Sequence, residues 1–446
     1  MKSPLSHSFW LLVPLYCGLV AAGGSRPAAA AEARKLAVAE AEQLALSSSP
    51  ALQAARLRLR AGEDSLRSVR GRLLPAVRLS EEYQHYANPF VIPFPGTPPT
   101  QITVRSQDTN TFVLAAEQPL LGLTRGIEEY RGQKLTAAAG QDQLSAAAAT
   151  LREQVRVGYL RYFEAKALQD IARSSQQELA EQVTVAQARL KAGVLTNADV
   201  LRVQVALANA QQQEIVARTQ AEIARGGVLI TCGFSPADAT IELSEPTELI
   251  AAGQKTLPGY DGAHAQSMRL RPELVQGQHL AAAADRQRRA RLYALLPDIN
   301  LEAAYVRVDG QGFAPPDSLY VGLKAQWAIW EWGTTYYGYK AARAQAEAAL
   351  LDLEAQRRQI VGEVATDLAQ AAAAQSAVQL AQQSIKSAEE AYRVTLALVK
   401  AGAATTTDLL DSQSALTQAR LSLTRAQYQQ AIAHVQLTHT LGDGAS

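Results

Sequence analysis

Cysteine and aromatic residues are scarce in this 446-residue chain, and neither sign of charge dominates. The only two cysteines are Cys17 and Cys232. The first lies in a segment that is predicted below to be removed, so no internal disulfide is expected in the mature protein. Aromatic residues make up 6% of the chain, which is low for a globular core and typical of long helices that pack along narrow seams. The net charge of +1 gives no indication of nucleic-acid binding.

Motifs of enzymes and of metal sites are also missing. The six histidines never stand at metal-ligand spacing with a carboxylate, and no HExxH sequence occurs. No glycine-rich phosphate loop follows a predicted strand. The sequence therefore predicts a protein that is not an enzyme and that holds no cofactor or metal.

The first 31 residues are typical of a cleaved export signal. A basic residue precedes the apolar stretch Phe9–Val20, and small residues at Ala28–Ala31 suit cleavage. The apolar stretch is too short to span a bilayer as a helix, so the mature protein is expected to begin near Glu32. Tyr16 argues against lipid attachment at Cys17, because that reaction favours a small residue there, but the sequence leaves the question open.

An internal duplication is the main feature of what the chain does contain. Residues 190–207 (LKAGVLTNADVLRVQVAL) and 399–416 (VKAGAATTTDLLDSQSAL) are identical at nine of 18 positions. The match continues without a gap, at an offset of 209, to Gly233 and Gly442. A repeat of this length predicts one structural unit that occurs twice.

Nearer the N-terminus the offset between the two copies is 222 rather than 209. There Leu79 and Tyr83 correspond to Leu301 and Tyr305. The 13-residue segment Asn88–Thr100 accounts for the difference, so we expect a longer loop in the first copy. The predicted division is signal peptide 1–31, first repeat 32–234, linker 235–267 and second repeat 268–446.

Proline maps the helical part of each repeat. None occurs between Pro119 and Pro236, and none follows Pro316. Because proline breaks helices, these two runs of more than 110 residues can be almost wholly helical. The stretch from Gly122 to Thr196 alone would extend about 110 Å as a helix. Each repeat is therefore predicted to contain a long helical hairpin.

The turn of each predicted hairpin carries the same two signals. Gly193 and Gly402 each follow Lys-Ala, where a helix can end in a left-handed cap. A Thr-x-x-Asp sequence follows each glycine and reads as a capping box that opens the next helix. The capping residues are Thr196, Asp199, Thr405 and Asp408.

Four amphipathic strands are predicted, two before each hairpin. Apolar and polar residues alternate along them, and the length of about ten residues is that of a tilted membrane strand. This pattern suits an outer membrane barrel, although a half-buried soluble sheet shows the same alternation. The predicted strands are 76–86, 109–118, 298–308 and 318–328. The residues expected to face inward include Arg78, Glu82, Lys324 and Gln326. An aromatic cluster expected at the membrane interface comprises Trp327, Trp330, Trp332, Tyr336 and Tyr337.

Four strands cannot close a barrel alone. An open sheet edge within lipid would leave backbone groups without hydrogen-bond partners. The membrane interpretation therefore requires strands from other copies of the chain, and three copies would supply twelve.

The duplication, the Leu-Leu-Pro before the first strand of each repeat and the K-A-G-x-x-T-x-x-D turn together resemble the TolC-like outer membrane efflux proteins. These are the exit ducts of Gram-negative tripartite exporters and type I secretion systems. The resemblance covers nearly all of the mature chain. It implies a mainly α-helical homotrimer, with a twelve-stranded β-barrel in the outer membrane above a twelve-helix α-barrel that crosses the periplasm. Asn88–Thr100 and the shorter Asp309–Asp317 would be extracellular loops.

The resemblance also implies two kinds of partner and two functional surfaces. A periplasmic adaptor would dock on the helical turns, and an inner-membrane pump of the RND, ABC or MFS type would supply energy through it. The implied docking residues are Arg189, Gly193, Val194, Leu195 and Thr196 in one repeat, and Lys400, Gly402, Ala403, Ala404 and Thr405 in the other. The implied pore constriction comprises Asp408 and Asp411, with Asp199 and Arg202 as their counterparts in the first repeat.

The chain departs from the family pattern at the implied constriction. Val399 and Ala404 stand where better-known members have a tyrosine and an arginine that latch the closed tip. Arg202 carries the opposite charge to Asp411, its counterpart. We hypothesise that Arg202 pairs with Asp411 or Asp408 of a neighbouring helix.

Two alternatives belong to other classes of protein. A periplasmic adaptor would have a single hairpin flanked by lipoyl-like and small barrel domains, and a coiled-coil structural protein would keep strict heptads without amphipathic strands. Neither accounts for the duplicated strand pairs. The substrate of export, whether drug, metal, solvent or polypeptide, is not readable from the sequence.

Overall fold

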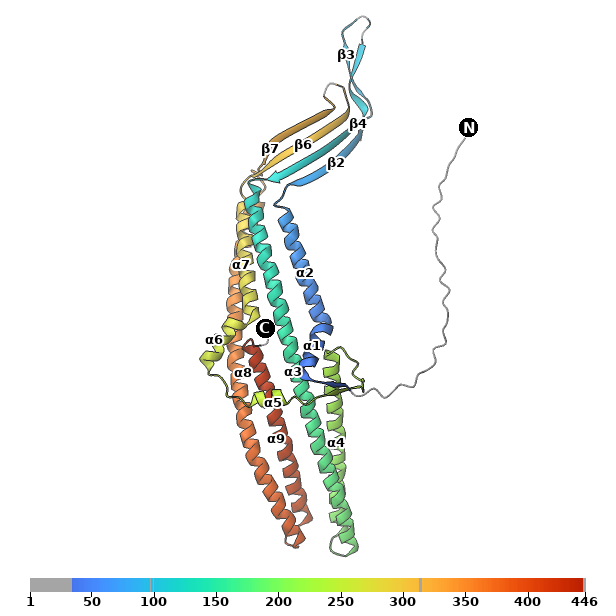
Figure 1. Ribbon diagram of the computed structural model, residues 1–446, viewed down its shortest axis with the longest axis vertical. Coiled ribbons are helices and arrows are strands. Elements are labelled where there is room, and N and C mark those ends of the chain that lie inside the picture. The colour runs from blue at the N-terminus through green and yellow to red at the C-terminus, as the bar shows by residue number, and fades with distance from the viewer. Residues whose placement is uncertain (1–33, 97, 99, 313–314, 444–446) are drawn as a thin grey trace, which may run out of the picture.

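The structure, a computed structural model, describes residues 34–443 except 97, 99, 313 and 314. The predicted signal peptide 1–31 and Cys17 lie outside the described residues. The chain is elongated, with a β-sheet at one end, the turns of two helical hairpins at the other, and short elements around the middle (Figure 1).

The sheet is antiparallel and has five strands rather than the four predicted. Strands β2, β4, β6 and β7 lie side by side in that order, and the short β3 pairs with the outer part of β4. Their bounds are Ala76–His85 for β2, Phe90–Phe94 for β3, Thr100–Pro119 for β4, Asp298–Gln311 for β6 and Asp317–Gln326 for β7.

Strand β3 lies within Asn88–Thr100, the segment that the sequence predicted to be a longer loop. The segment forms a hairpin with β4 that projects beyond the rest of the sheet (Figure 1). Phenylalanine, valine and isoleucine favour strands, and Pro93 is tolerated because β3 pairs on one side only. The loop was predicted from the change of offset between the repeats, which gives no information on strand pairing.

Six of the helices in the described residues form the elongated part of the molecule. The 70-residue α3 extends about 105 Å at 1.5 Å per residue, close to the length predicted. None of the helices in the described part of the chain is long and apolar enough to cross a membrane. The bounds are Pro50–Gly71 for α2, Gly122–Lys191 for α3, Asn197–Thr231 for α4, Pro272–Tyr293 for α7, Thr334–Lys400 for α8 and Thr406–Thr440 for α9.

The helices pack along narrow seams, with α3 in contact with α2, α4, α7 and α9. At the α3–α7 seam, a Cβ on Gly132 would lie 3.3 Å from the Cβ of Arg286, so glycine permits close approach there. Glu128 is buried beside it and accepts hydrogen bonds from Arg286 at 3.1 Å and Arg131 at 2.8 Å. Burial alone would raise the pKa of Glu128, but these two arginines outweigh it and lower the pKa.

Short elements surround the helices near mid-length (Figure 1). One buried cluster joins β1, α1 and β5 to α3 and α4, and Leu36, Tyr159 and Leu229 are fully buried in it. The Tyr159 hydroxyl donates to the Leu36 carbonyl. Cys232 is buried in the same cluster, which raises the pKa of its thiol to about 11. The short elements are the parallel pair β1 (Arg34–Leu36) and β5 (Ile241–Leu243), with α1 (Val38–Ser48), α5 (Thr247–Gly253) and α6 (Tyr260–Leu270).

Candidate functional site: the amphipathic sheet and the helical tips

The sheet has one apolar face and one polar face. Directly opposed residues of an antiparallel pair lie on the same face, and Leu79 is opposite Leu114 while Leu301 is opposite Leu323. The apolar face is open to solvent in the isolated chain, although it is the part of the sheet that would ordinarily be covered. Its large exposed side chains include Val77, Leu79, Tyr83, Leu114, Leu301, Leu319, Val321 and Leu323.

The apolar face ends in polar contacts near the β3 hairpin. The Tyr83 hydroxyl donates to Asp108 at 2.6 Å, and His85 lies 2.7 Å from the same carboxylate. In the second repeat the Tyr305 hydroxyl donates to Asp317. Two tyrosines thus present rings to the apolar face and hydroxyls to acidic groups above it, an arrangement suited to the boundary between lipid and water.

The aromatic cluster predicted from the sequence lies at the opposite end of the apolar face. Trp327, Trp330 and Trp332 are exposed, and the rings of Trp330 and Trp332 meet edge to face at 5.5 Å. Tyr336 and Tyr337 follow in the first turn of α8 and are also exposed. Leu319 to Trp327 measures about 26 Å along the strand, or about 20 Å across a membrane at a tilt of about 40°.

The other face of the sheet carries a hydrogen-bonded polar network. Glu117 accepts from Arg78 at 3.3 Å and from Asn300 at 2.7 Å. The Tyr320 hydroxyl donates to Glu302 at 2.8 Å. These contacts link all four long strands on the face to which the sequence assigned Arg78 and Lys324.

The two helical tips have the same backbone geometry. Gly193 and Gly402 have φ of +76° and +75°, a left-handed conformation that favours glycine. The N–H of Gly193 donates to Leu190 and that of Val194 to Arg189, both at 2.9 Å. The N–H groups of Gly402 and the residue after it bond in the same way to Val399 and Leu398. Both glycines therefore end their helices in a Schellman motif.

Both capping boxes predicted from the sequence are present. Thr196 and Asp199 exchange side-chain and backbone hydrogen bonds, as do Thr405 and Asp408. Hydrogen bonds from Thr196 lower the pKa of Asp199, and those from Thr405 lower the pKa of Asp408. Both carboxylates are thus held ionised at the first turn of a helix, where negative charge is favourable.

The structure places Arg202 differently from the pairing hypothesised from the sequence. Its Nη1 lies 3.2 Å from Oδ1 of Asp199, one turn earlier in the same helix. Asp408 and Asp411, its hypothesised partners, are exposed and make no ion pair within the described chain. Asp199 and Arg202 are three residues apart on one helix, a spacing at which side chains can pair. Asp199 is therefore a partner for Arg202 within one chain, which the comparison of the two repeats had not considered.

The residues expected to dock a partner surround the two turns. Most are exposed, Val194 most clearly at 68%. Arg189, Leu195 and Ala404 are partly buried. Leu195 packs on the small apolar cluster that joins α3 and α4 beneath the turn, so it supports the turn as well as bordering its surface.

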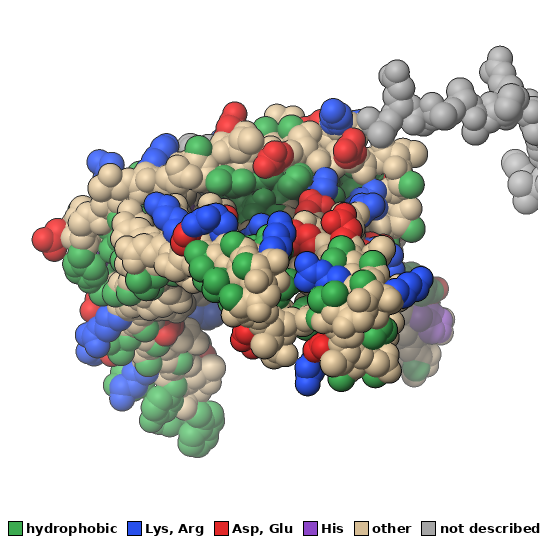
Figure 2. All heavy atoms as spheres, turned by 90° about the horizontal axis from the view of Figure 1, so that it is seen from below, with side chains coloured by type: hydrophobic (Ala, Val, Ile, Leu, Met, Phe, Trp, Pro, Cys, Tyr) green, Lys and Arg blue, Asp and Glu red, His purple; other side chains and the backbone are tan. Residues whose placement is uncertain are grey.

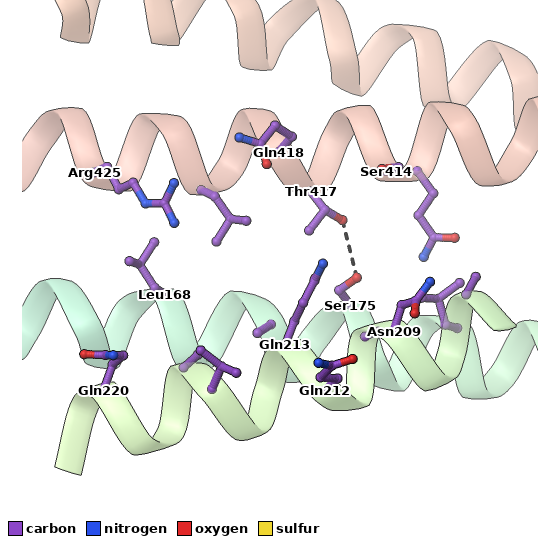
Figure 3. A pocket seen from close by; sticks show the side chains of 18 of the residues that line it. Leu168, Ser175, Asn209, Gln212, Gln213, Gln220, Ser414, Thr417, Gln418 and Arg425 are labelled. Carbon is purple, nitrogen blue, oxygen red and sulfur yellow. Dashed lines mark hydrogen bonds between the residues drawn. The ribbon is translucent and has the colours of Figure 1, made fainter. Parts of the chain in front are cut away.

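A polar groove between the hairpins was not recognised in the sequence. It has a volume of about 790 Å³ and lies between α4 and α9, with α3 as its floor (Figure 3). Ser175 and Thr417 meet across it at 3.4 Å. Glutamines line the groove from both flanking helices, whereas serine does so only from α9. These glutamines are the signal that the sequence offered. The labelled polar lining includes Asn209, Gln212, Gln213, Gln220, Ser414 and Gln418.

The lower end of the molecule carries both signs of charge. Basic and acidic side chains are intermixed there rather than gathered into a patch of one sign (Figure 2). Within residues 34–443, as far as they are described, no group of three or more His, Cys, Asp or Glu side chains is arranged to hold a metal ion.

The sequence model of the family described as outer membrane efflux protein matches residues 41–228 and 265–443. The outer membrane efflux protein BepC of Brucella suis is 24% identical over 288 residues, which cover 63% of this chain and 61% of BepC. The chain thus matches about three fifths of the length of that relative.

Solved structures share the fold. The outer membrane protein VceC of Vibrio cholerae superposes with a TM-score of 0.78 at 18% identity, covering 91% of this chain and 96% of VceC. The open state of the MtrE outer membrane channel of Neisseria gonorrhoeae superposes with a TM-score of 0.75 at 18% identity, covering 92% and 89%.

Proposed function

The chain belongs to the outer membrane efflux protein family, as its sequence predicted, and on that premise we propose that three copies form a passive export duct. Four long strands from each copy would close a twelve-stranded barrel in the outer membrane. The long helices would continue it as a twelve-helix tunnel through the periplasm. An inner-membrane pump would drive export through a periplasmic adaptor.

The observation that carries this proposal is a sheet with an exposed apolar face and two open edges. Leu319, Val321 and Leu323 are 69–78% exposed in one chain, and lipid is the medium in which such a face is stable. Strands β2 and β7 each pair on one side only. Unpaired backbone groups within lipid cost several kcal/mol each, so the edges require partners.

The helical tips support docking of an adaptor. The Schellman turns leave Gly193 and Gly402 with no other atom within 4 Å of an added Cβ. A partner backbone can therefore approach both turns closely. We assign docking to the ten tip residues named from the sequence.

Acidic residues at the second tip support a constriction. Asp408 and Asp411 are exposed at the start of α9 and form no ion pair among the described residues. In a trimer they would supply six carboxylates around the duct, a set that attracts cations and repels anions. Asp199 and Arg202 would contribute a neighbouring pair of opposite charge.

The rival classes are less compatible with the molecule. An adaptor has one hairpin, whereas this chain has two hairpins with the same turn geometry. A fibrous coiled coil would not contain the amphipathic sheet.

The test is isolation from outer membranes in detergent. A trimer that migrates as monomer only after heating, and that conducts ions in planar bilayers, is expected. A protein that stays monomeric and soluble without detergent would contradict the proposal.

A further inference from the structure

The internal repeat is visible in the structure as a repeat of contacts. Adding 222 to Leu79 gives Leu301, and adding 209 to Leu114 gives Leu323. These two pairs are directly opposed in β2–β4 and in β6–β7 respectively. The two strand pairs therefore have the same register, and the sequence offsets identify equivalent positions in three dimensions.

Two seams have no counterpart within one chain. β4 pairs with β6, and α3 packs against α7. The equivalent seams would join β7 to β2 and α8 to α2, but in one chain β7 and β2 are the opposite edges of the sheet. Each chain thus has both sides of this seam, β7 with α8 and β2 with α2, but the two sides cannot meet within one chain.

We propose that β7 and α8 of one subunit bind β2 and α2 of the next subunit in the register of the β4–β6 and α3–α7 seams. The inference rests on the proposed trimer and specifies its interface. Leu114 is opposite Tyr305 within the chain. The equivalent position between chains places Leu323 opposite Tyr83 of the partner subunit. Adding 209 to each residue of β4 and subtracting 222 from its partner in β6 gives the other pairs between β7 and β2 of the partner subunit.

Charge complementarity supports this register. Ala115 is opposite Ala304 within the chain. Adding 209 to the first and subtracting 222 from the second places Lys324 directly opposite Glu82 of the partner subunit. Lys324 makes no ion pair among the described residues, and Glu82 only accepts a hydrogen bond from Gln84 at 2.6 Å. Opposite charges at directly opposed positions stabilise an antiparallel pair.

The helical seam gives independent support. Within the chain His279 of α7 lies 2.7 Å from Asp142 of α3. The equivalent residues between chains are Leu57 of the partner subunit and Leu351. Both are large apolar side chains that remain 65% and 71% exposed in one chain. Their mutual contact would bury two leucines that nothing in the described chain covers.

Cysteine pairs test the strand register in the full-length trimer. Lys324→Cys combined with Glu82→Cys is expected to give covalently linked subunits on oxidation, because directly opposed Cβ atoms lie about 4.5–5.5 Å apart. Lys324→Cys combined with Gln84→Cys is the matched control. It lies on the same face but diagonally, at about 7–8 Å, and should link several-fold less. Cys232 does not interfere, since it is buried.

A second pair tests the helices. Leu351→Cys with Leu57→Cys should link subunits through a short bis-maleimide. Leu351→Cys with Leu59→Cys should not, because Leu59 faces α3 of its own chain, where its Cδ1 would lie 3.5 Å from a Cβ added to Gly140. Charge reversal is the third measurement. Lys324→Glu should lower the temperature at which the trimer dissociates, and Lys324→Glu with Glu82→Lys should restore it.

The outcomes separate the interface from the function. An intact trimer in which the Gln84 pair links as fast as the Glu82 pair would overturn the register while leaving the duct in place. Failure of the reversed pair to restore thermal stability would overturn the ion pair. A protein that never trimerises would remove the proposed function together with the interface.

Discussion

Leu323→Arg tests whether the apolar face of the sheet contacts lipid. Leu323 is 69% exposed and lies midway between Leu319 and Trp327 on that face. In water, a substitution at so exposed a position typically changes stability by less than about 0.5 kcal/mol. At the middle of a bilayer, arginine costs about 2–4 kcal/mol. Three subunits would therefore lose about 6–12 kcal/mol together, which is enough to abolish insertion.

Gly322→Arg is the matched control. Gly322 is the adjacent residue on the polar face, and no other atom lies within 4 Å of an added Cβ. Arginine there would enter the lumen and should cost little. The assay is refolding into lipid vesicles at increasing urea, followed by the heat-sensitive mobility of the trimer. Equal midpoints for the two variants would refute the membrane assignment of this face.

Three further predictions concern the helical tips. The lowered pKa values of Asp199 and Asp408 mean that both caps contribute stability above the ordinary pKa of 3.8 and lose it as the pH falls through the folded values. Hydrogen exchange at the first turns of α4 and α9, corrected for intrinsic rates, should be flat from pH 5 to 7 and rise below pH 4. A rise near pH 6 would contradict this. Arg202→Ala should increase cation selectivity and strengthen block by divalent cations in planar bilayers, since it removes the positive charge beside Asp199. Unchanged conductance and block would exclude Arg202 from the constriction. Gly193→Ala should accelerate exchange at its turn roughly fivefold to thirtyfold, because a left-handed residue with a Cβ costs about 1–2 kcal/mol. Gly193→Asn, which tolerates that conformation, should change exchange much less, and equal effects would contradict the capping argument.

The sequence predicted those features that depend on the spacing of residues close together in the chain. Proline-free runs and the Gly and Thr-x-x-Asp signals of the turns depend on local chemistry, so they predicted α3, α8 and both tips closely. Alternation predicted which face of the sheet holds Arg78 and Lys324, because neighbouring residues of a strand must point to opposite sides.

The features that sequence missed depend on neighbours far along the chain. Strand β3 exists because β4 extends far enough to pair with it, and the change of offset that predicted a longer loop there does not reveal this pairing. The ion pair of Arg202 with Asp199 competes with the pairing hypothesised across helices, and only coordinates show which partner one subunit offers. The groove over α3 depends on how α4 and α9 are placed on it, and the glutamines of these two helices alone do not specify that placement.

The matching backbones of the two tips bear on the stoichiometry of assembly. In the proposed trimer six turns of the same shape would ring the lower mouth, while Arg202 and Asp411 would alternate at equivalent positions around it. A partner that contacts only the main chain would find six equivalent binding sites. A partner that also contacts the charged side chains would find only three equivalent sites. The same ring could therefore bind six or three copies of a partner, depending on whether binding involves those side chains.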